Sequence, residues 1–112
     1  MNQAADNILN VDICVIGAGS GGLSVAAGAS QMGASVVLVE KGEMGGDCLN
    51  SGCVPSKALL AAGHAAQAMR DAGPFGIKAR EPEVDWQQVH DHVHGVIAAI
   101  APNDSQQRFE DL

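Results

Sequence analysis

Positive charge and aromatic side chains are scarce in this sequence. Its 112 residues include six lysines and arginines against thirteen aspartates and glutamates, which gives a formal net charge of −7. Nucleic acids and anionic membrane surfaces are bound through clusters of basic residues, so the composition argues against both as partners. With one tryptophan, two phenylalanines and no tyrosine, any core must be built from aliphatic and small side chains.

Targeting and membrane-spanning signals are absent as well. No lysine or arginine precedes Lys41, which argues against the basic start of a secretory signal and against an arginine-rich transit peptide. The longest apolar stretch, residues 23–39, is interrupted by glycine, serine and glutamine and is too polar to span a bilayer. We therefore expect a cytoplasmic protein that does not enter a membrane.

What the sequence does contain is a strand–helix–strand pattern punctuated by glycine. Residues 12–16 form a β-branched run that predicts a buried parallel strand. The alanine-rich residues 20–32 have helical spacing and stop at Gly33, as expected of a helix C′ position. Residues 35–40 predict a second buried strand, so the fold class is α/β with a βαβ unit. The polar residues 1–10 are expected to be loosely ordered.

Two further helices are predicted in the second half of the chain. Residues 41–52 are expected to be a glycine-broken connection, and residues 56–72 a helix with Pro55 in its first turn. Asp85 opens the next helix, where Gln88 completes a capping box. Six apolar residues of that helix share one face at a spacing of three to four: Trp86, Val89, Val93, Val96, Ile97 and Ile100.

A G-x-G-x-x-G sequence, residues 17–22, joins the first strand to the first helix. Gly17 permits a tight turn, Gly19 leaves room for a pyrophosphate beside the backbone, and Gly22 lets helix and strand pack closely. The helix N-terminus offers N–H groups and partial positive charge to a diphosphate. Glu40 ends the second strand, where a carboxylate can bind ribose hydroxyls and repels a 2′-phosphate. The pattern predicts FAD or NAD; a purely structural turn is the alternative.

Cys48 and Cys53 stand five residues apart in a glycine-flanked segment. On a regular helix their Cα atoms would be about 8.7 Å apart, beyond the roughly 7 Å that a disulfide allows. Residues 50–52 tolerate irregular backbone, so a distorted turn could bring the sulfurs together. Cys53 then starts a helix whose dipole stabilises a thiolate, and Lys57 adds positive charge on the same face. This arrangement predicts thiol–disulfide exchange.

Zinc binding and a simple buried pair are the alternatives for the two cysteines. Structural zinc usually takes four ligands, and a second Cys/His pair at a suitable spacing is missing. His90 and His94 share a helix face while His92 is turned away, which favours solvated side chains, and we expect no bound metal. Cys14 is expected to be a small core residue of the first strand, and His64 a packing or surface residue.

Together the two motifs resemble those of the pyridine nucleotide–disulfide oxidoreductases, the family of dihydrolipoamide dehydrogenase, mercuric reductase and glutathione reductase. The turn at residues 17–22 fits the family's glycine pattern, and residues 45–57 fit its active-site signature. Asp47 departs from that signature at a position that contacts the flavin nucleotide in the family, since most members have threonine there. Ser56 before Lys57 resembles the lipoamide and mercuric branches more than the glutathione branch.

The resemblance implies FAD at the glycine turn and NAD(P)H as co-substrate. Cys48 would exchange with substrate, Cys53 would lie nearest the flavin, and Lys57 near its reactive nitrogen. Electrons would pass from NAD(P)H through FAD to the disulfide of Cys48 and Cys53, then to a small-molecule or protein-bound disulfide, or to mercuric ion. The cofactor-binding residues that it implies are Gly17, Gly19, Ser20 and Gly22 at the diphosphate, Glu40 at the ribose, and Lys41, Gly46, Asp47, Cys48 and Lys57 at the flavin nucleotide.

The resemblance also bears on domain organisation. Residues 11–112 are expected to be the N-terminal part of a Rossmann-like FAD-binding domain, with the NAD(P)H and dimerisation domains outside this chain and the intact enzyme a homodimer. Even the first domain would be incomplete, because its few strands would leave an unpaired sheet edge. The competing hypothesis is a non-catalytic module that binds a nucleotide or carries a thiol.

Overall fold

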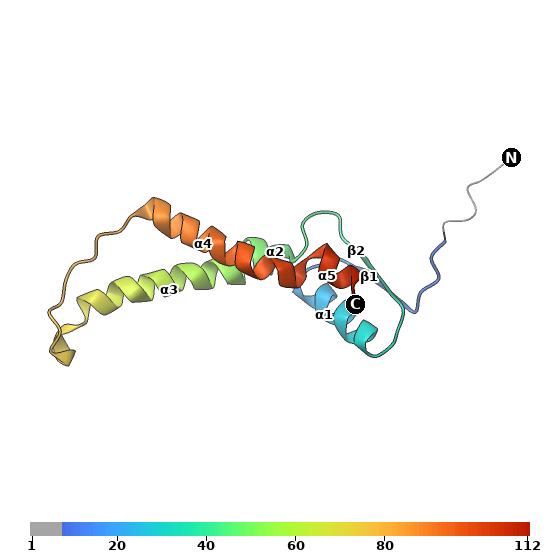
Figure 1. The fold of residues 1–112 in the computed structure, drawn as a ribbon, viewed down its shortest axis with the longest axis horizontal. Helices are drawn as coiled ribbons and strands as arrows, with labels where there is room; N and C mark the ends of the chain where they lie inside the picture. The colour runs from blue at the N-terminus through green and yellow to red at the C-terminus, as the bar shows by residue number, and fades with distance from the viewer. Residues whose placement is uncertain (1–7) are drawn as a thin grey trace. The chain divides into compact units, whose positions relative to one another are not determined.

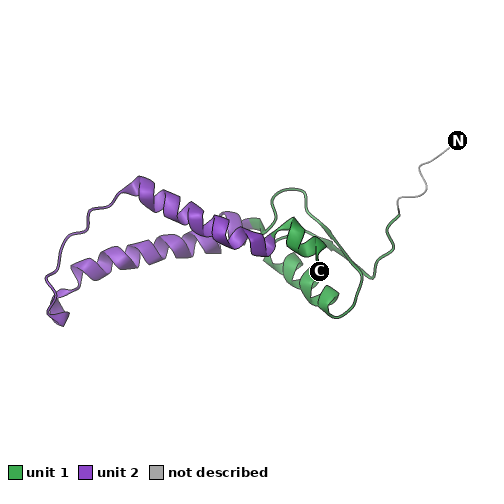
Figure 2. Ribbon diagram, in the orientation of Figure 1, with its two compact units in different colours: residues 1–46, 105–112 green, residues 47–104 purple. Residues whose placement is uncertain are grey.

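The computed structural model describes residues 8–112. The predicted loose lead, residues 1–10, therefore lies largely outside the described residues, and residues 8–10 belong to no helix or strand. The chain divides into two compact units (Figure 2). Unit 1 comprises the residues up to Gly46 together with Ser105–Leu112, and unit 2 comprises Asp47–Asp104.

Unit 1 contains a parallel strand–helix–strand arrangement (Figure 1). The two strands pair in register, from Ile13 opposite Val36 to Ile16 opposite Val39. This confirms the predicted α/β class and the βαβ unit. The elements of unit 1 are β1 (Ile13–Ile16), α1 (Ser20–Gln31), β2 (Val36–Val39) and the short α5 (Gln106–Glu110).

Glycine ends α1 as predicted. Met32 is the C-cap, and Gly33 follows with φ of 87°, a backbone conformation that side chains other than glycine rarely adopt. The N–H of Gly33 donates to the carbonyl of Ser30 at 2.9 Å, and the N–H of Ala34 to that of Ala29 at 3.0 Å. The last carbonyls of the helix are thereby paired, and the chain turns into β2.

The strands are less buried than the sequence predicts. The side chain of Val15 points toward α1 and is only 9% exposed, and Leu23 and Ala26 of α1 are buried as well. The side chain of Ile16, by contrast, is 86% exposed. Successive side chains of a strand point to opposite faces, so α1 covers one face and leaves Cys14 and Ile16 on the other. Cys14 is exposed. The prediction of a core Cys14 is therefore wrong, and the prediction of buried strands holds on the α1 face only. Within residues 8–112, unit 1 has no second layer over the other face.

Unit 2 is a helical hairpin. It contains a short helix that the sequence analysis assigned to the glycine-broken connection 41–52, and its first long helix begins three residues earlier than predicted. The bounds are α2 (Gly46–Asn50, with Gly46 still in unit 1), α3 (Cys53–Arg70), the 3₁₀ turn η1 (Gly73–Phe75), α4 (Trp86–Ile100) and the 3₁₀ turn η2 (Ala101–Asp104).

The apolar face of α4 packs against small residues of α3. Ala58 is 7% exposed, and Ala62 and Ala66 follow at four-residue spacing and are half-buried. Trp86, predicted for the inner face, is 72% exposed, because it occupies the first position of α4, directly after the loop that joins α3 to α4. The other predicted residues of that face are all half-buried: Val89, Val93, Val96, Ile97 and Ile100.

Asp85 caps α4. Its Oδ1 accepts hydrogen bonds from the backbone N–H groups of Gln87 at 3.0 Å and Gln88 at 3.2 Å. The side-chain amide of Gln88 donates to Asp85 Oδ2 at 3.2 Å, so the box closes through the carboxylate and not through the Asp85 backbone. The predicted helix start is confirmed, with this change in the reciprocal bond.

Replacing Asp85 with alanine should lower the free energy of unfolding by about 1 kcal/mol, because two N–H groups of α4 lose their cap. Urea unfolding followed by helical circular dichroism measures this loss. Glu83→Ala removes an equal charge from the exposed loop before the helix and should change stability by less than about 0.5 kcal/mol. Equal losses in the two variants would show that charge, and not capping, is responsible.

Candidate functional site

The glycine turn of unit 1 is held by backbone contacts that exclude side chains. Gly17 has φ of 106°, and its N–H donates to the carbonyl of Val39 at 2.7 Å, which ties the turn to the end of β2. A Cβ on Gly22 would lie 1.8 Å from the Gly17 carbonyl oxygen and 3.3 Å from Val15 Cγ1. The tight turn and the close helix–strand packing predicted for these two glycines are both present.

The start of α1 is open to an anionic group. Gly19 is the N-cap, no side chain caps the helix there, and its first turn holds no acidic residue. A Cβ placed on Gly19 or Gly21 would meet nothing within 4 Å, and Ser20 is exposed. The first N–H groups of a helix carry partial positive charge. A diphosphate therefore fits this turn without displacing a side chain of the described chain.

Glu40 holds the turn from the end of β2. Its Oε2 accepts the N–H of Ala18 at 2.5 Å and its Oε1 accepts the N–H of Gly42 at 3.0 Å. Ala18 is fully buried, and its carbonyl accepts the N–H of Gly45 at 2.9 Å. The bond from Ala18, followed by that from Gly42, lowers the pKa of Glu40 below its usual range. A carboxylate offers about four acceptor positions, so at least one remains for a ribose hydroxyl when the weaker contact from the Lys41 backbone is counted as well.

The segment after β2 touches the turn through another glycine. Gly46 has φ of 59°, and a Cβ there would lie 2.8 Å from the Cα of Gly19, so the two backbones are in direct contact. Lys41 follows Glu40 and is exposed. Seven of the predicted cofactor-binding residues thus belong to unit 1, on the turn or on the segment after β2: Gly17, Gly19, Ser20, Gly22, Glu40, Lys41 and Gly46.

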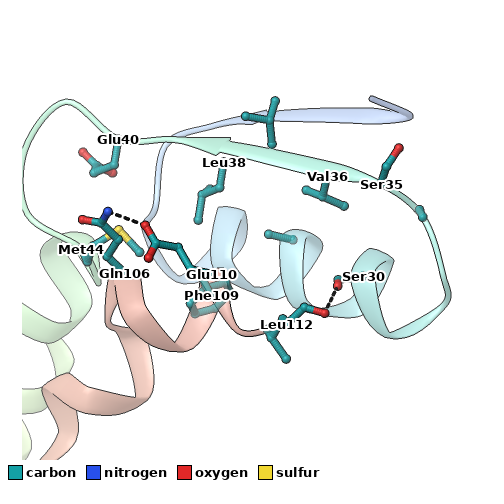
Figure 3. A pocket seen from close by; sticks show the side chains of 13 residues that line it. Ser30, Ser35, Val36, Leu38, Glu40, Met44, Gln106, Phe109, Glu110 and Leu112 are labelled. Atoms are coloured by element: carbon teal, nitrogen blue, oxygen red, sulfur yellow. Dashed lines mark hydrogen bonds between the residues drawn. The ribbon is translucent and has the colours of Figure 1, made fainter. Parts of the chain in front are cut away.

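A pocket of about 660 Å³ in unit 1 has Glu40 in its lining (Figure 3). Val36 and Leu38 of β2 form one wall, and α5 faces them with Phe109 and Glu110. This volume lies in the range of small-molecule pockets. No local sequence pattern predicts this pocket, because its walls come from segments that lie far apart in the chain.

The backbone break predicted between the two cysteines is present in unit 2. A regular helix does not run from Cys48 to Cys53, because α2 ends before α3 begins at Cys53. A Cβ on Gly52 would lie 2.8 Å from the carbonyl oxygen of Asp47 and 3.4 Å from the Cα of Cys48. Gly52 has φ of −112°, so the turn depends on close backbone approach and not on a left-handed residue.

The two thiols differ in their surroundings. Both are free, with Cys53 exposed and Cys48 partly buried. The hydrogen bond between the two side chains raises the pKa of Cys48, and desolvation, the charge of Cys53 and that of Asp104 act in the same direction. Lys57 is exposed on α3, four residues after Cys53, and Asp47 lies in the first turn of α2. The arrangement presents a dithiol in which Cys48 holds its proton more firmly than an ordinary thiol.

The described residues offer neither a cluster of three metal ligands nor a membrane-spanning helix. Within residues 8–112, no group of three or more His, Cys, Asp or Glu side chains could hold a metal ion. His64 and the three histidines of α4 are exposed. In the same part of the chain, no helix is long and apolar enough to cross a membrane.

Similarity to known proteins extends over most of the chain. The family model of the pyridine nucleotide-disulphide oxidoreductases matches residues 11–107. Dihydrolipoyl dehydrogenase of Geobacillus stearothermophilus is 40% identical over 95 residues, which are 85% of this chain and 20% of that protein. Mercuric reductase of Streptomyces lividans is 50% identical over 76 residues, 67% of this chain and 16% of that protein.

The chain spans about a fifth of the length of these curated relatives. The family match nevertheless covers both motifs, the glycine turn with its open helix start and the paired cysteines at the helix break. The parallel βαβ unit is the fold that a dinucleotide-binding turn of this kind requires. The chain therefore belongs to the pyridine nucleotide-disulphide oxidoreductases, a family of FAD-dependent enzymes.

Proposed function

We propose that this chain supplies the FAD-binding turn and the redox-active dithiol of an NAD(P)H-dependent disulfide oxidoreductase. The observation that carries the proposal is the occurrence in one chain of an uncapped helix start behind a glycine turn and of two hydrogen-bonded cysteines at a helix break. In this proposal residues 11–112 are the N-terminal part of the FAD-binding domain of a homodimeric cytoplasmic enzyme. The family membership supports it.

The proposed cofactor role of unit 1 rests on its backbone. The N–H groups that follow Gly17 would bind the diphosphate of FAD, since Gly19 and Ser20 leave that surface open. Glu40 would bind the ribose through the acceptor positions that Ala18 and Gly42 do not use. Bound FAD supplies a two-electron carrier between the nicotinamide and the disulfide.

Four further residues complete the proposed flavin site. Gly46 keeps the segment after β2 in backbone contact with the turn. The resemblance to the family assigns Lys41 and Asp47 to the flavin nucleotide and Lys57 to the vicinity of the reactive flavin nitrogen. Lys57 matches the active-site signature of the family, and Asp47 departs from it. At Asp47 this chain carries a carboxylate where most members carry a threonine hydroxyl.

The proposed dithiol chemistry assigns one role to each cysteine. The Cys48 thiolate attacks one sulfur of the substrate disulfide, forming a mixed disulfide and releasing the first substrate thiolate. The Cys53 thiolate then attacks the sulfur of Cys48, which closes their disulfide and releases the second thiolate. Two electrons thus pass from the dithiol to the substrate, and FAD held at the glycine turn, once reduced by NAD(P)H, would supply the two electrons that reopen the Cys48–Cys53 disulfide. Because the pKa of Cys48 is raised, its thiol must lose its proton before the first attack.

The names of the relatives point to two substrates, a disulfide that follows the exchange steps above and a metal ion that accepts the same two electrons. The name of the Geobacillus relative favours a dihydrolipoyl-type disulfide, small or protein-bound, and that of the Streptomyces relative favours mercuric ion. The alternative, a non-catalytic nucleotide-binding or thiol-carrier module, requires FAD binding or thiol exchange without NAD(P)H oxidation. Assay of the FAD-loaded intact protein with NADH or NADPH, against a lipoamide-type disulfide and against mercuric ion, separates these cases. If neither NADH nor NADPH were oxidised in the presence of either substrate, the proposal that the intact protein is an enzyme would be refuted.

The intact protein should purify yellow, and Glu40→Ala should weaken FAD binding roughly tenfold or more, because a charged acceptor at both the turn and the ribose is lost. Fluorescence titration of the apoprotein with FAD measures the affinity. Glu43→Ala is the matched control, since it removes the same charge from an exposed position of the same loop. A colourless protein that folds but takes up no FAD would refute the cofactor assignment, and unchanged affinity in Glu40→Ala would refute the role of Glu40.

The pH dependence of FAD retention should follow Glu40. Because hydrogen bonds lower the pKa of Glu40 in the folded chain, its contribution is fully present above the usual carboxyl pKa and is lost only as pH falls through the lowered value. Retention is therefore expected to stay level from neutral pH into the usual carboxyl range and to fall below it. Glu40→Gln should lack this acidic step in the flavin fluorescence. If the parent protein and Glu40→Gln both lost FAD at the same acidic pH, the titrating group would be a residue other than Glu40.

Alkylation should distinguish the two cysteines, and the order should depend on FAD. Without FAD, iodoacetamide should modify Cys53 first, because Cys53 is exposed while Cys48 is partly buried with a raised pKa. In the two-electron-reduced holoenzyme the order should reverse, because the flavin covers Cys53. Cys48→Ser should keep a long-wavelength flavin–thiolate absorbance that Cys53→Ser loses. Peptide mapping by mass spectrometry reads the order, and Cys53 modified first in the holoenzyme would reverse the assignment.

A further inference from the structure

His90 and His94 form a pair on the exposed surface of α4. Their ring centroids are 4.2 Å apart with the planes tilted by 45°. Residues four apart lie one above the other on a helix, and both side chains face solvent. Two imidazoles at this separation can each direct one nitrogen at the same cation, which a single histidine cannot do.

A carboxylate lies beside the ring of His90. The Nδ1 of His90 is 3.6 Å from Oδ1 of Asp91, and that oxygen accepts a hydrogen bond from the side-chain amide of Gln87 at 2.9 Å. At 3.6 Å the imidazole and the carboxylate are beyond hydrogen-bond distance, so this contact does not fix the tautomer of His90. The carboxylate adds negative charge next to the histidine pair, which favours a bound cation.

We propose that His90 and His94 chelate a divalent first-row transition cation, with copper(II) bound most tightly. Imidazole suits these cations, and affinities for nitrogen sites rise to a maximum at copper(II). Two protein ligands leave the remaining coordination positions to water, so the site exchanges its cation, unlike a closed four-ligand structural site. The sequence alone favours solvated histidines, and the contact between the two rings is the observation that it could not provide.

The site uses no residue of the proposed FAD or dithiol chemistry, so the two proposals stand or fall separately. His92 provides an internal control, since it is equally exposed on the same helix but turned about 200° away from His90. All three histidines lie outside the buried face of the hairpin, so their replacement leaves the packing of α3 on α4 unchanged.

Titration of the full chain with copper(II) chloride tests the proposal. Thiols bind and reduce copper, so the titration is made in the Cys14→Ser, Cys48→Ser, Cys53→Ser background, with circular dichroism to verify the helices; iodoacetamide-blocked chain replaces this background if the helices are lost. Calorimetry gives the affinity, and electron paramagnetic resonance shows nitrogen ligation. His90→Gln and His94→Gln should each weaken binding roughly tenfold or more, because the second ligand no longer acts at high effective concentration.

His92→Gln should stay within about twofold of its parent. The double variant His90→Gln, His94→Gln should lose little more than either single variant, because either replacement already breaks the chelate. Unchanged affinity in His90→Gln or His94→Gln would overturn the proposal. So would a loss in His92→Gln as large as that in His90→Gln, since it would assign binding to histidines at large and not to the pair.

Discussion

The backbone contact between Gly22 and Gly17 governs the architecture of unit 1. Because a Cβ on Gly22 would lie 1.8 Å from the Gly17 carbonyl oxygen, α1 can begin directly against the end of β1. Parallel strands end at the same edge, so β2 delivers Glu40 to the place where α1 starts. The open helix N-terminus and the carboxylate therefore meet at one turn, which is the arrangement that a nucleotide diphosphate and its ribose require.

The cysteine segment uses the same physical device for another purpose. Gly52 approaches the carbonyl of Asp47 more closely than any side chain allows, and this interrupts the helix between Cys48 and Cys53. On an uninterrupted helix the two Cα atoms would be about 8.7 Å apart, too far for sulfur chemistry between them. At the break the two side chains are hydrogen-bonded to each other. Gly22 thus leaves the backbone N–H groups at the start of α1 exposed, and Gly52 brings the two thiols together.

Features with a local cause could be predicted from the sequence. The strands, α1 and its end at Gly33, and the cap at Asp85 depend on periodicity and on single residues, and they agree with the structure within a few positions. The exposure of Cys14 and Trp86 could not be predicted, because burial depends on which other elements cover a face. The short α2 has too few residues for a periodic signal. The pocket beside Glu40 needs segments that only the fold brings together.

The bond from Ala18 to Glu40 links the shape of the turn to the affinity for its ligand. If Glu40 acted on the ribose alone, the turn would have to be ordered when the ligand binds, and that ordering would reduce the affinity. In the structure the carboxylate already holds the turn through Ala18 and the following loop through Gly42. A ribose that uses the remaining acceptor positions binds a turn that is already formed. One side chain can therefore preorganise the diphosphate site and recognise the sugar, because a carboxylate has more acceptor positions than either task needs.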